Sequence, residues 1–252
     1  MGTSDHENTL LKSAAIVGTI TIAGTLSPAP AQSASVFTGS SGALSASVSF
    51  DISGSNLLVQ LTNTGSGANV PADILTAVFW DIAENPSLSL SSANAPTVTQ
   101  NNPNTSSTNV NLLNTPGNGQ EWSFAQNSSG LPGVSQRYGL GTAGLNIFQG
   151  IGGQQQFQYG IVNGYGNSAN NPVQQAPLVN NVANFVLAGL PNNFNLADIS
   201  NVRFQYGTNL NEPNFPGTSV PTPALLPGLL ALGAGVLRKR KAEQAAEAET
   251  EV

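Results

Sequence analysis

The stretch ADILTAVFWDI, residues 72–82, constrains the fold more than any other part of the chain. It is apolar at all but three positions and rich in β-branched and aromatic side chains, which pack well in a strand that is buried on both faces. Pro71 and Pro86 bracket it. Proline has no backbone N–H to donate and is excluded from central ladders, so these two residues fit the ends of such a strand. We therefore expect a central β-strand over 72–82.

Alternating apolar residues precede this strand. Ala46, Val48, Phe50 and Ile52 recur at every second position of residues 43–52, which places them on one face of a strand. Gly54 and Ser55 then form a turn signal before a second apolar segment, residues 56–63. The pattern predicts a β-hairpin.

The rest of the middle segment also indicates strands and loops. Residues 183–190 and 199–207 have clear strand patterns, whereas the Ser-, Asn-, Thr- and Pro-rich residues 83–130 predict edge strands and long loops. The Gly-, Gln- and Asn-rich residues 139–175 fit either a flexible excursion or glycine-punctuated strands. We predict an all-β fold, a single β-sandwich domain over residues 35–219 with long polar loops, flanked by an N-terminal signal helix and a C-terminal transmembrane helix.

The side chains of this domain exclude much chemistry. Between residues 35 and 220 there are seven acidic residues against two arginines, with no Lys, His or Cys. Ser-His-Asp and Cys-His catalysis and His or Cys sites for zinc or copper are therefore impossible within the domain. The chain carries a net charge of −6, which would repel nucleic acid. We expect a protein that is not an enzyme, has no cofactor or metal site of these types and does not bind nucleic acid.

The N-terminus has the order of a secretory signal. Lys12 precedes an apolar stretch from residue 14 to 26, and small residues suited to cleavage follow at 29–31 or 32–34. We predict that residues 1–34 are a signal peptide recognised by a secretion translocon. An uncleaved N-terminal anchor or a buried strand is the alternative.

The C-terminus combines a short apolar run with a basic cluster. Residues 224–237 are apolar, and a helix of that length reaches only ~21 Å, against a hydrocarbon core of ~30 Å. Basic flanks stay on the cytoplasmic side, so the segment would hold the β domain on the outer side of the membrane with residues 242–252 as an acidic cytoplasmic tail. A plain stop-transfer anchor is an alternative reading of the same features.

The order of these parts resembles the PEP-CTERM type of sorting signal, in the PTPA variant known from cyanobacteria. The matching residues are the motif Pro221, Thr222, Pro223 and Ala224 and the basic cluster Arg238, Lys239, Arg240 and Lys241, within a signal that spans residues 220–241. The resemblance implies a membrane-embedded exosortase as partner. It also implies export through the inner membrane, at least transient anchoring there, and a final location at the cell surface or in the extracellular matrix.

Residues 45–213 also resemble a family of exosortase-dependent surface proteins, through the segments at 50–88, GQEWSF and ISNVRFQYGTNLNEP. That family implies a secreted β domain without assigned catalysis. The function expected from both resemblances is a non-enzymatic surface or matrix protein of biofilms or cell aggregates. A carbohydrate-binding module on the cell surface is the alternative, with polysaccharide as partner.

Few residues of the domain suggest a site. Asp81 and Glu84, near Asp73 or Glu121, could form a carboxylate pair for glycoside hydrolysis or provide oxygen ligands for calcium. More ordinary roles, accepting backbone N–H bonds or facing solvent, are expected of such isolated acids. Arg203 is expected to face solvent and pair with an acid on a neighbouring strand.

Aromatic side chains could form a platform for sugar stacking. The candidates are Trp80, Trp122, Tyr138, Tyr159, Tyr165 and Tyr206. Trp80 is expected in the core, with its indole N–H bonded to the backbone. Trp122, in the polar context QEWSF, is the better ligand-binding candidate of the two tryptophans, although the core is the more usual position for so large an aromatic side chain.

Two sequons and one polar stretch could carry glycans. Asn104 and Asn127 each begin an Asn-x-Ser pattern. The Ser- and Thr-rich residues 87–115 are suited to O-linked glycans. Glycosylation would add water-retaining bulk to a surface with few charges.

Overall fold

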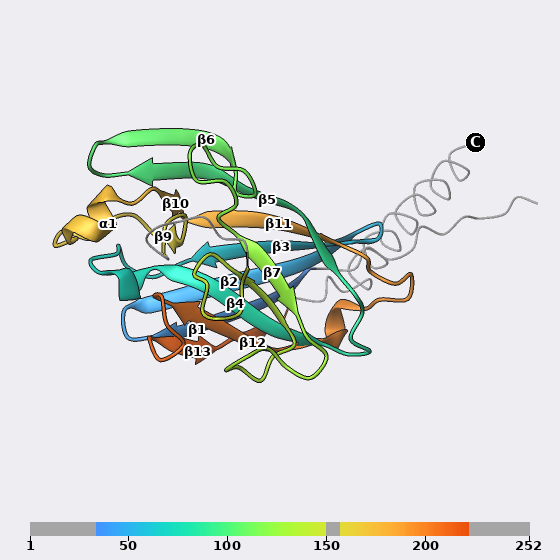
Figure 1. Ribbon diagram of the computed structural model, residues 1–252. Coiled ribbons are helices and arrows are strands. Elements are labelled where there is room, and N and C mark those ends of the chain that lie inside the picture. Colours follow the sequence, from blue (N-terminus) through green and yellow to red (C-terminus); the bar gives the residue numbers. More distant parts are fainter. Residues whose placement is uncertain (1–33, 150–156, 222–252) are drawn as a thin grey trace, which may run out of the picture. The chain divides into compact units, whose positions relative to one another are not determined.

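The computed structural model describes residues 34–149 and 157–221, and this part of the chain is mostly β (Figure 1). The prediction of an all-β fold is confirmed. Among the described residues the only α-helix is α1 (Asn171–Gln175), and two 3₁₀ turns lie at Pro71–Asp73 and Leu196–Asp198. The strands are β1 (Ser35–Ser41), β2 (Leu44–Ser53), β3 (Asn56–Asn63), β4 (Leu75–Ile82), β5 (Ser89–Gln100), β6 (Thr105–Asn111), β7 (Ser123–Gln126), β8 (Tyr138–Gly141), β9 (Ile161–Val162), β10 (Leu178–Asn180), β11 (Val182–Ala188), β12 (Ile199–Tyr206), β13 (Asn214–Pro216) and β14 (Thr218–Val220).

The predicted hairpin at 43–63 is present as β2 and β3. The two strands pair antiparallel from Ala46 opposite Asn63 to Ser53 opposite Asn56, with Gly54 in a left-handed conformation in the turn. Val48 and Phe50 are fully buried, as their alternation with polar residues requires. Polar residues of β2 therefore lie on the opposite face of the sheet.

The predicted central strand is β4, and it is buried on both faces. Val78 and Trp80 belong to the main core, whereas Ala77 and Phe79 pack into a separate apolar cluster with Phe148. Because both faces are covered, the strand has no need of the apolar–polar alternation that a half-exposed strand shows. The N-terminal part of the predicted segment differs, since residues 71–73 form a 3₁₀ turn.

All fourteen strands of the described residues belong to one mixed sheet, and eleven of them follow the path β13-β12-β4-β9-β10-β5-β11-β3-β2-β1-β14. Off this path, β6 pairs with β5, β8 with β4, and β7 with β8. β13 pairs with β12 and β14 pairs with β1, and only Gly217 separates β13 from β14. The chain therefore crosses from one end of the path to the other at this glycine. A Cβ atom at Gly217 would approach Val202 Cγ1 to 2.8 Å, so a larger residue would not fit without displacement.

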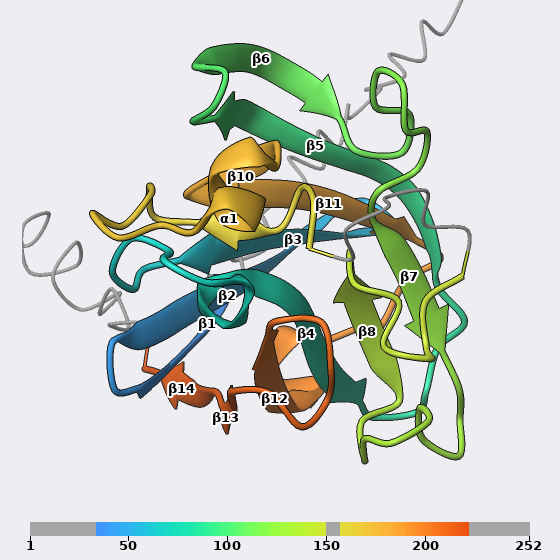
Figure 2. The ribbon, with the colours of Figure 1, turned by 60° about the vertical axis from the view of Figure 1, so that its left-hand side comes forward.

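The sheet folds into two layers with the main core between them. In Figure 2, β5, β11, β3, β2 and β1 form one layer, and β4, β12, β8 and β7 lie against it. The rings of Phe50 on β2 and Trp80 on β4 are 5.5 Å apart, and both side chains belong to the main core. Aromatic contacts thus join the two layers across the interior.

The polar region 83–130 is more ordered than loops with edge strands. β5 is an inner strand, because it pairs with β6 on one side and with β10 and β11 on the other. β6 forms the outer strand of this hairpin, and its side chains from Thr105 to Asn109 are exposed. The segment 139–175, for which either a flexible excursion or glycine-punctuated strands were expected, includes strand β9 and helix α1.

Both predicted membrane-directed ends lie outside the described residues. These are the signal peptide, apart from Ala34, and the sorting signal beyond Pro221, with the acidic tail. Within 34–149 and 157–221, no helix has the length and apolar character needed to cross a membrane.

Candidate functional site

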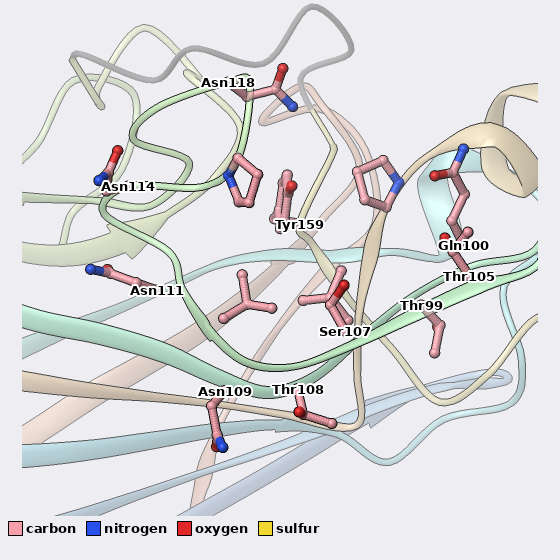
Figure 3. A pocket seen from close by; sticks show the side chains of 14 residues that line it. Thr99, Gln100, Thr105, Ser107, Thr108, Asn109, Asn111, Asn114, Asn118 and Tyr159 are labelled. Atoms are coloured by element: carbon pink, nitrogen blue, oxygen red, sulfur yellow. The ribbon is translucent and has the colours of Figure 1, made fainter.

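A pocket of about 520 Å³ lies beside the β5–β6 hairpin and is the best candidate for a binding site. In Figure 3, Tyr159 lies between Asn118, from the loop after β6, and Ser107, on β6. None of the lining residues is charged. They are Val98, Thr99, Gln100, Thr105, Ser107, Thr108, Asn109, Val110, Asn111, Asn114, Pro116, Asn118, Tyr159 and Pro177.

Local backbone bonds hold the walls of this pocket. The loop after β6 is closed by two backbone hydrogen bonds between Thr115 and Gly119, of 2.7 and 3.1 Å. Tyr159 adopts a left-handed conformation with φ of 57°, and its N–H donates to the Pro177 carbonyl at 2.7 Å. The Tyr159 carbonyl in turn accepts the indole N–H of Trp122 at 2.8 Å. These hydrogen bonds therefore hold the backbone around the pocket in place without a ligand.

Glu121 is the most unusual polar residue near the pocket. Its side chain is 1% exposed, and neither carboxyl oxygen accepts a hydrogen bond from the described residues. Burial raises the pKa of Glu121 to about 7, and the nearby Asn118 amide lowers it by a smaller amount without reaching hydrogen-bond geometry. The carboxyl group is thus partly neutral at physiological pH, which is uncommon for a glutamate.

Glu121 adjoins the pocket through its neighbours. Asn118 and Tyr159 both line the pocket, and both interact electrostatically with Glu121. Burial raises the pKa of Tyr159, the Thr115 hydroxyl lowers it, and the charge of Glu121 raises it further. Glu121 is therefore linked to the pocket through these two lining residues, although it does not line the pocket itself.

Trp122 is not a surface residue, so its candidacy as a ligand-binding residue was wrong. It is fully buried, its ring lies 4.9 Å from that of Phe185, and its N–H is bonded to Tyr159. The polar neighbours that suggested exposure are themselves covered, since Glu121 and Ser123 are also buried. Trp122 contributes to the core and supports the pocket from beneath.

The other aromatic residues do not form a platform. Tyrosine hydroxyls donate to backbone carbonyls, from Tyr138 to Pro86 at 2.8 Å and from Tyr206 to Ser45 at 2.9 Å. Tyr165 does the same toward Thr99 at 2.8 Å. Trp80 is buried as expected, but its indole N–H has no hydrogen-bond partner among the described residues, contrary to the prediction.

Asp81 joins three segments of the fold. Its carboxylate accepts hydrogen bonds from the backbone N–H and the Nε of Arg137 at 2.9 and 3.1 Å, and from the Asn201 amide at 2.8 Å. Arg137 also donates to the Ile82 carbonyl at 2.8 Å. These contacts tie β4 to the start of β8 and to β12. They are the contacts of a structural ion pair, which leaves Asp81 little capacity for a further ligand.

Glu84 and Asp73 do not complete a site with Asp81. Glu84 is exposed in the turn after β4, and Asp73 accepts the N–H groups of Asn69 and Val70 at the start of its own 3₁₀ turn. Within the described ranges, no three His, Cys, Asp or Glu residues gather closely enough to hold a metal ion. Asp81, Glu84 and Asp73 therefore have separate roles in the fold.

Arg203 also differs from its prediction. Its partners across the neighbouring strands are Phe79 and Pro216 rather than an acid. Burial lowers the pKa of Arg203, and its Nε atom has no hydrogen-bond partner among the described residues. The local sequence pattern does not reveal strand register. Here the register sets the apolar residues Phe79 and Pro216 opposite Arg203 on the two neighbouring strands.

The pocket is chemically suited to a neutral ligand rich in hydroxyl groups. Amide side chains such as Asn114 both donate and accept hydrogen bonds, as do the hydroxyls of Ser107 and Thr108. Tyr159, which is 6% exposed, adds an aromatic side chain to this lining. No family model, curated protein or solved structure matches this chain. The resemblance to exosortase-dependent surface proteins therefore stays a prediction.

Several residues of this pocket were missed at the level of sequence. Asn114, Asn118 and Ser107 lie in a polar stretch that had suggested only a loop or a glycan carrier. The absence of any charge between Pro86 and Gln120 was a usable signal, because a solvent-exposed hairpin normally carries some. Tyr159 could not be assigned to the pocket, because its position depends on contacts between distant segments.

Proposed function

We propose that this chain is an exported, non-enzymatic surface or extracellular-matrix protein built on a sandwich-like β domain and sorted by an exosortase-type system. The observation that carries the proposal is the order of motif, apolar run and basic cluster at residues 221–241. The folded domain is compatible with it, since acids such as Asp81 and Glu212 are used in local contacts. A role in biofilm or aggregate formation follows from the location.

Deleting residues 221–252 is expected to abolish surface display and release the domain into the medium, because the deletion removes both the motif and the basic cluster. Antibody labelling of intact cells, compared with the amount in the medium, measures this. Unchanged localisation of the deleted chain would overturn the proposal.

A matched variant separates a sorting signal from a plain anchor. Replacing Pro221 and Pro223 with alanine leaves the apolar run and the basic cluster intact. A sorting signal would lose surface display in this variant, whereas a stop-transfer anchor would behave as before. The intact mass of the native protein shows whether the N-terminal signal peptide and the C-terminal sorting signal have been cleaved. It also reports glycans, for which the exposed Asn104 and Asn127 and the β5–β6 hairpin are the proposed carriers.

Carbohydrate binding is the second candidate function, and the neutral pocket beside β5 and β6 favours it. Hydroxyl and amide groups surround a space of about 520 Å³ that suits a short sugar chain. The ligand class would be a neutral glycan, because the lining offers no cation for an acidic one. Glu121, in its protonated form, would keep the wall behind Tyr159 free of charge.

Combined replacement of Ser107 and Asn114 with alanine is expected to weaken binding of neutral oligosaccharides about tenfold or more, because each lost hydrogen bond contributes about 1 kcal/mol. Both side chains line the pocket, and neither makes a hydrogen bond to another described side chain. A glycan array followed by calorimetry measures the change. The control replaces the exposed Asn192 and Ser219, away from the pocket. Absence of binding by the unaltered protein to any neutral glycan would remove this candidate.

A further inference from the structure

A row of polar side chains crosses five neighbouring strands on the outer face of the larger layer. Ser49 on β2 is paired with Gln60 on β3, and Gln60 with Asn184 on β11. Asn184 is paired in turn with Asn94 on β5, and Asn94 with Asn111 on β6. Directly paired residues lie on the same face of a sheet, so these five side chains form one line perpendicular to the strands. We call this line the amide row.

The amide row faces away from the core. The residues next to its members along the strands, Phe50, Val59, Phe185 and Ala93, are all buried in the main core. Because side chains alternate between the two faces of a strand, the row lies on the opposite face. Neighbouring strands are about 4.8 Å apart, so four steps give the row a span of roughly 19 Å.

A shallow groove coincides with part of this row. It has a volume of about 270 Å³ and is lined by Ser49, Gln60 and Asn184 together with Leu58 and Val186. Leu58 and Val186 are paired with each other across β3 and β11, next to the amide row. The groove therefore combines a polar line with a parallel apolar strip.

The hydrogen bonds within the row leave donors and acceptors available in alternation. The Gln60 amide N–H donates to Asn184 Oδ1 at 3.0 Å, which leaves the Gln60 oxygen as an acceptor and the Asn184 NH₂ as a donor. Asn94 donates to the Val110 carbonyl at 3.2 Å, and its oxygen stays available. Asn111 Oδ1 accepts the Leu113 N–H at 2.9 Å, so its NH₂ also stays available. Hydroxyl groups both donate and accept, and a chain of them can match this alternation.

We propose that the amide row is a binding surface for one extended, neutral polysaccharide chain that lies across the strands. Repeated sugar hydroxyls would bond to the amides, and the apolar C–H faces of the sugars would rest on Leu58 and Val186. Asp51 is the only charged residue lining the groove. An acidic polymer would find no cation there and would be repelled by a domain with seven acids and two bases. This inference rests on the surface function proposed above, and of the five residues of the amide row only Asn111, at its end, also lines the β5–β6 pocket.

Affinity electrophoresis of the full chain through gels that contain hydroxyethylcellulose tests the proposal, with polygalacturonate as the acidic counterpart. We expect retardation by the neutral polymer alone. Combined replacement of Gln60 and Asn184 with alanine is expected to raise the dissociation constant about tenfold or more, because it removes the middle of the row. The control replaces the exposed Asn192 and Asn193 in the loop after β11. The single variant Gln60→Ala, whose side chain is exposed, provides a milder test if the double variant is unstable.

The outcomes separate this inference from the other proposals. Full retention of affinity by the double variant would overturn it, as would equal retardation by polygalacturonate. Loss of polymer binding only in the Ser107 and Asn114 variant would assign binding to the pocket and overturn the row. Sedimentation that shows dimers dependent on Gln60 and Asn184, without polymer binding, would replace the polysaccharide with a second copy of the chain. Surface display after deletion of 221–252 is measured separately and does not depend on any of these results.

Discussion

Replacing Trp122 with alanine is expected to lower the free energy of unfolding by about 3 to 5 kcal/mol, because truncation of a fully buried tryptophan removes apolar contacts and leaves a cavity. The contact with Phe185 and the hydrogen bond to the Tyr159 carbonyl are lost together. Chemical denaturation followed by circular dichroism measures the change. Loss of sugar binding in this variant would therefore report unfolding and not a missing contact with ligand.

Trp80 offers a matched comparison for the hydrogen bond of Trp122. Both indoles are fully buried, but only that of Trp122 has a partner for its N–H. Trp122→Phe would leave the Tyr159 carbonyl without its bond, whereas Trp80→Phe would remove an unsatisfied donor. We expect the Trp122 variant to be less stable than the Trp80 variant by about 1 to 2 kcal/mol. Equal stabilities, or the reverse order, would contradict this account.

Replacing Glu121 with glutamine is expected to stabilise the protein by about 1 to 3 kcal/mol at pH 8. The pKa of Glu121 is raised from 4.5 to about 7 in the folded state, mainly by burial. Below pH 4.5 the carboxyl is protonated in the folded and unfolded chains and has no effect on stability. Between pH 4.5 and about 7 the unfolded chain releases this proton while the folded chain still holds it, so stability falls over that interval and levels off above pH 7.

The pH dependence of unfolding distinguishes Glu121 from other groups. The unaltered protein is expected to lose stability between about pH 4.5 and 7, and Glu121→Gln is expected to lose less over the same interval. Glu84→Gln is the control, because it removes a carboxyl from an exposed turn. Tyr159, the titratable neighbour of Glu121, has a raised pKa and stays neutral over this range. Identical slopes for the unaltered protein and Glu121→Gln would show that the carboxyl is not desolvated.

The strands whose burial pattern is local were predictable. The β2–β3 hairpin follows from alternation that ends in a turn signal, and β4 follows from an apolar segment between prolines. Strand β5 was less predictable, because its many small polar residues resemble a loop even though it pairs on both sides. Backbone pairing rather than apolar side chains places that strand in the sheet, and side-chain patterns do not report it.

The candidate site was mostly hidden from sequence analysis. QEWSF is polar, yet Glu121, Trp122 and Ser123 are buried, because distant segments that include Phe185 and Tyr159 pack against them. Asp81 and Glu84 are close in the chain but have separate roles, one in an ion pair and the other in an exposed turn. Spacing along the chain places two carboxyl groups near each other without saying what each one contacts.

Residue order alone was enough to establish the β class, the first hairpin and the doubly buried strand, because these depend on a side-chain period of two and on turn residues. It also excluded every chemistry that needs Lys, His or Cys within the domain. The tertiary structure decided which polar residues meet. Strand order and register align Ser49, Gln60 and Asn184, and the fold brings Tyr159 near enough to Glu121 for the charge of Glu121 to raise the pKa of Tyr159. The pairing of strands that are distant in the chain depends on the apolar surface that the whole domain buries. A short stretch of sequence does not contain that information.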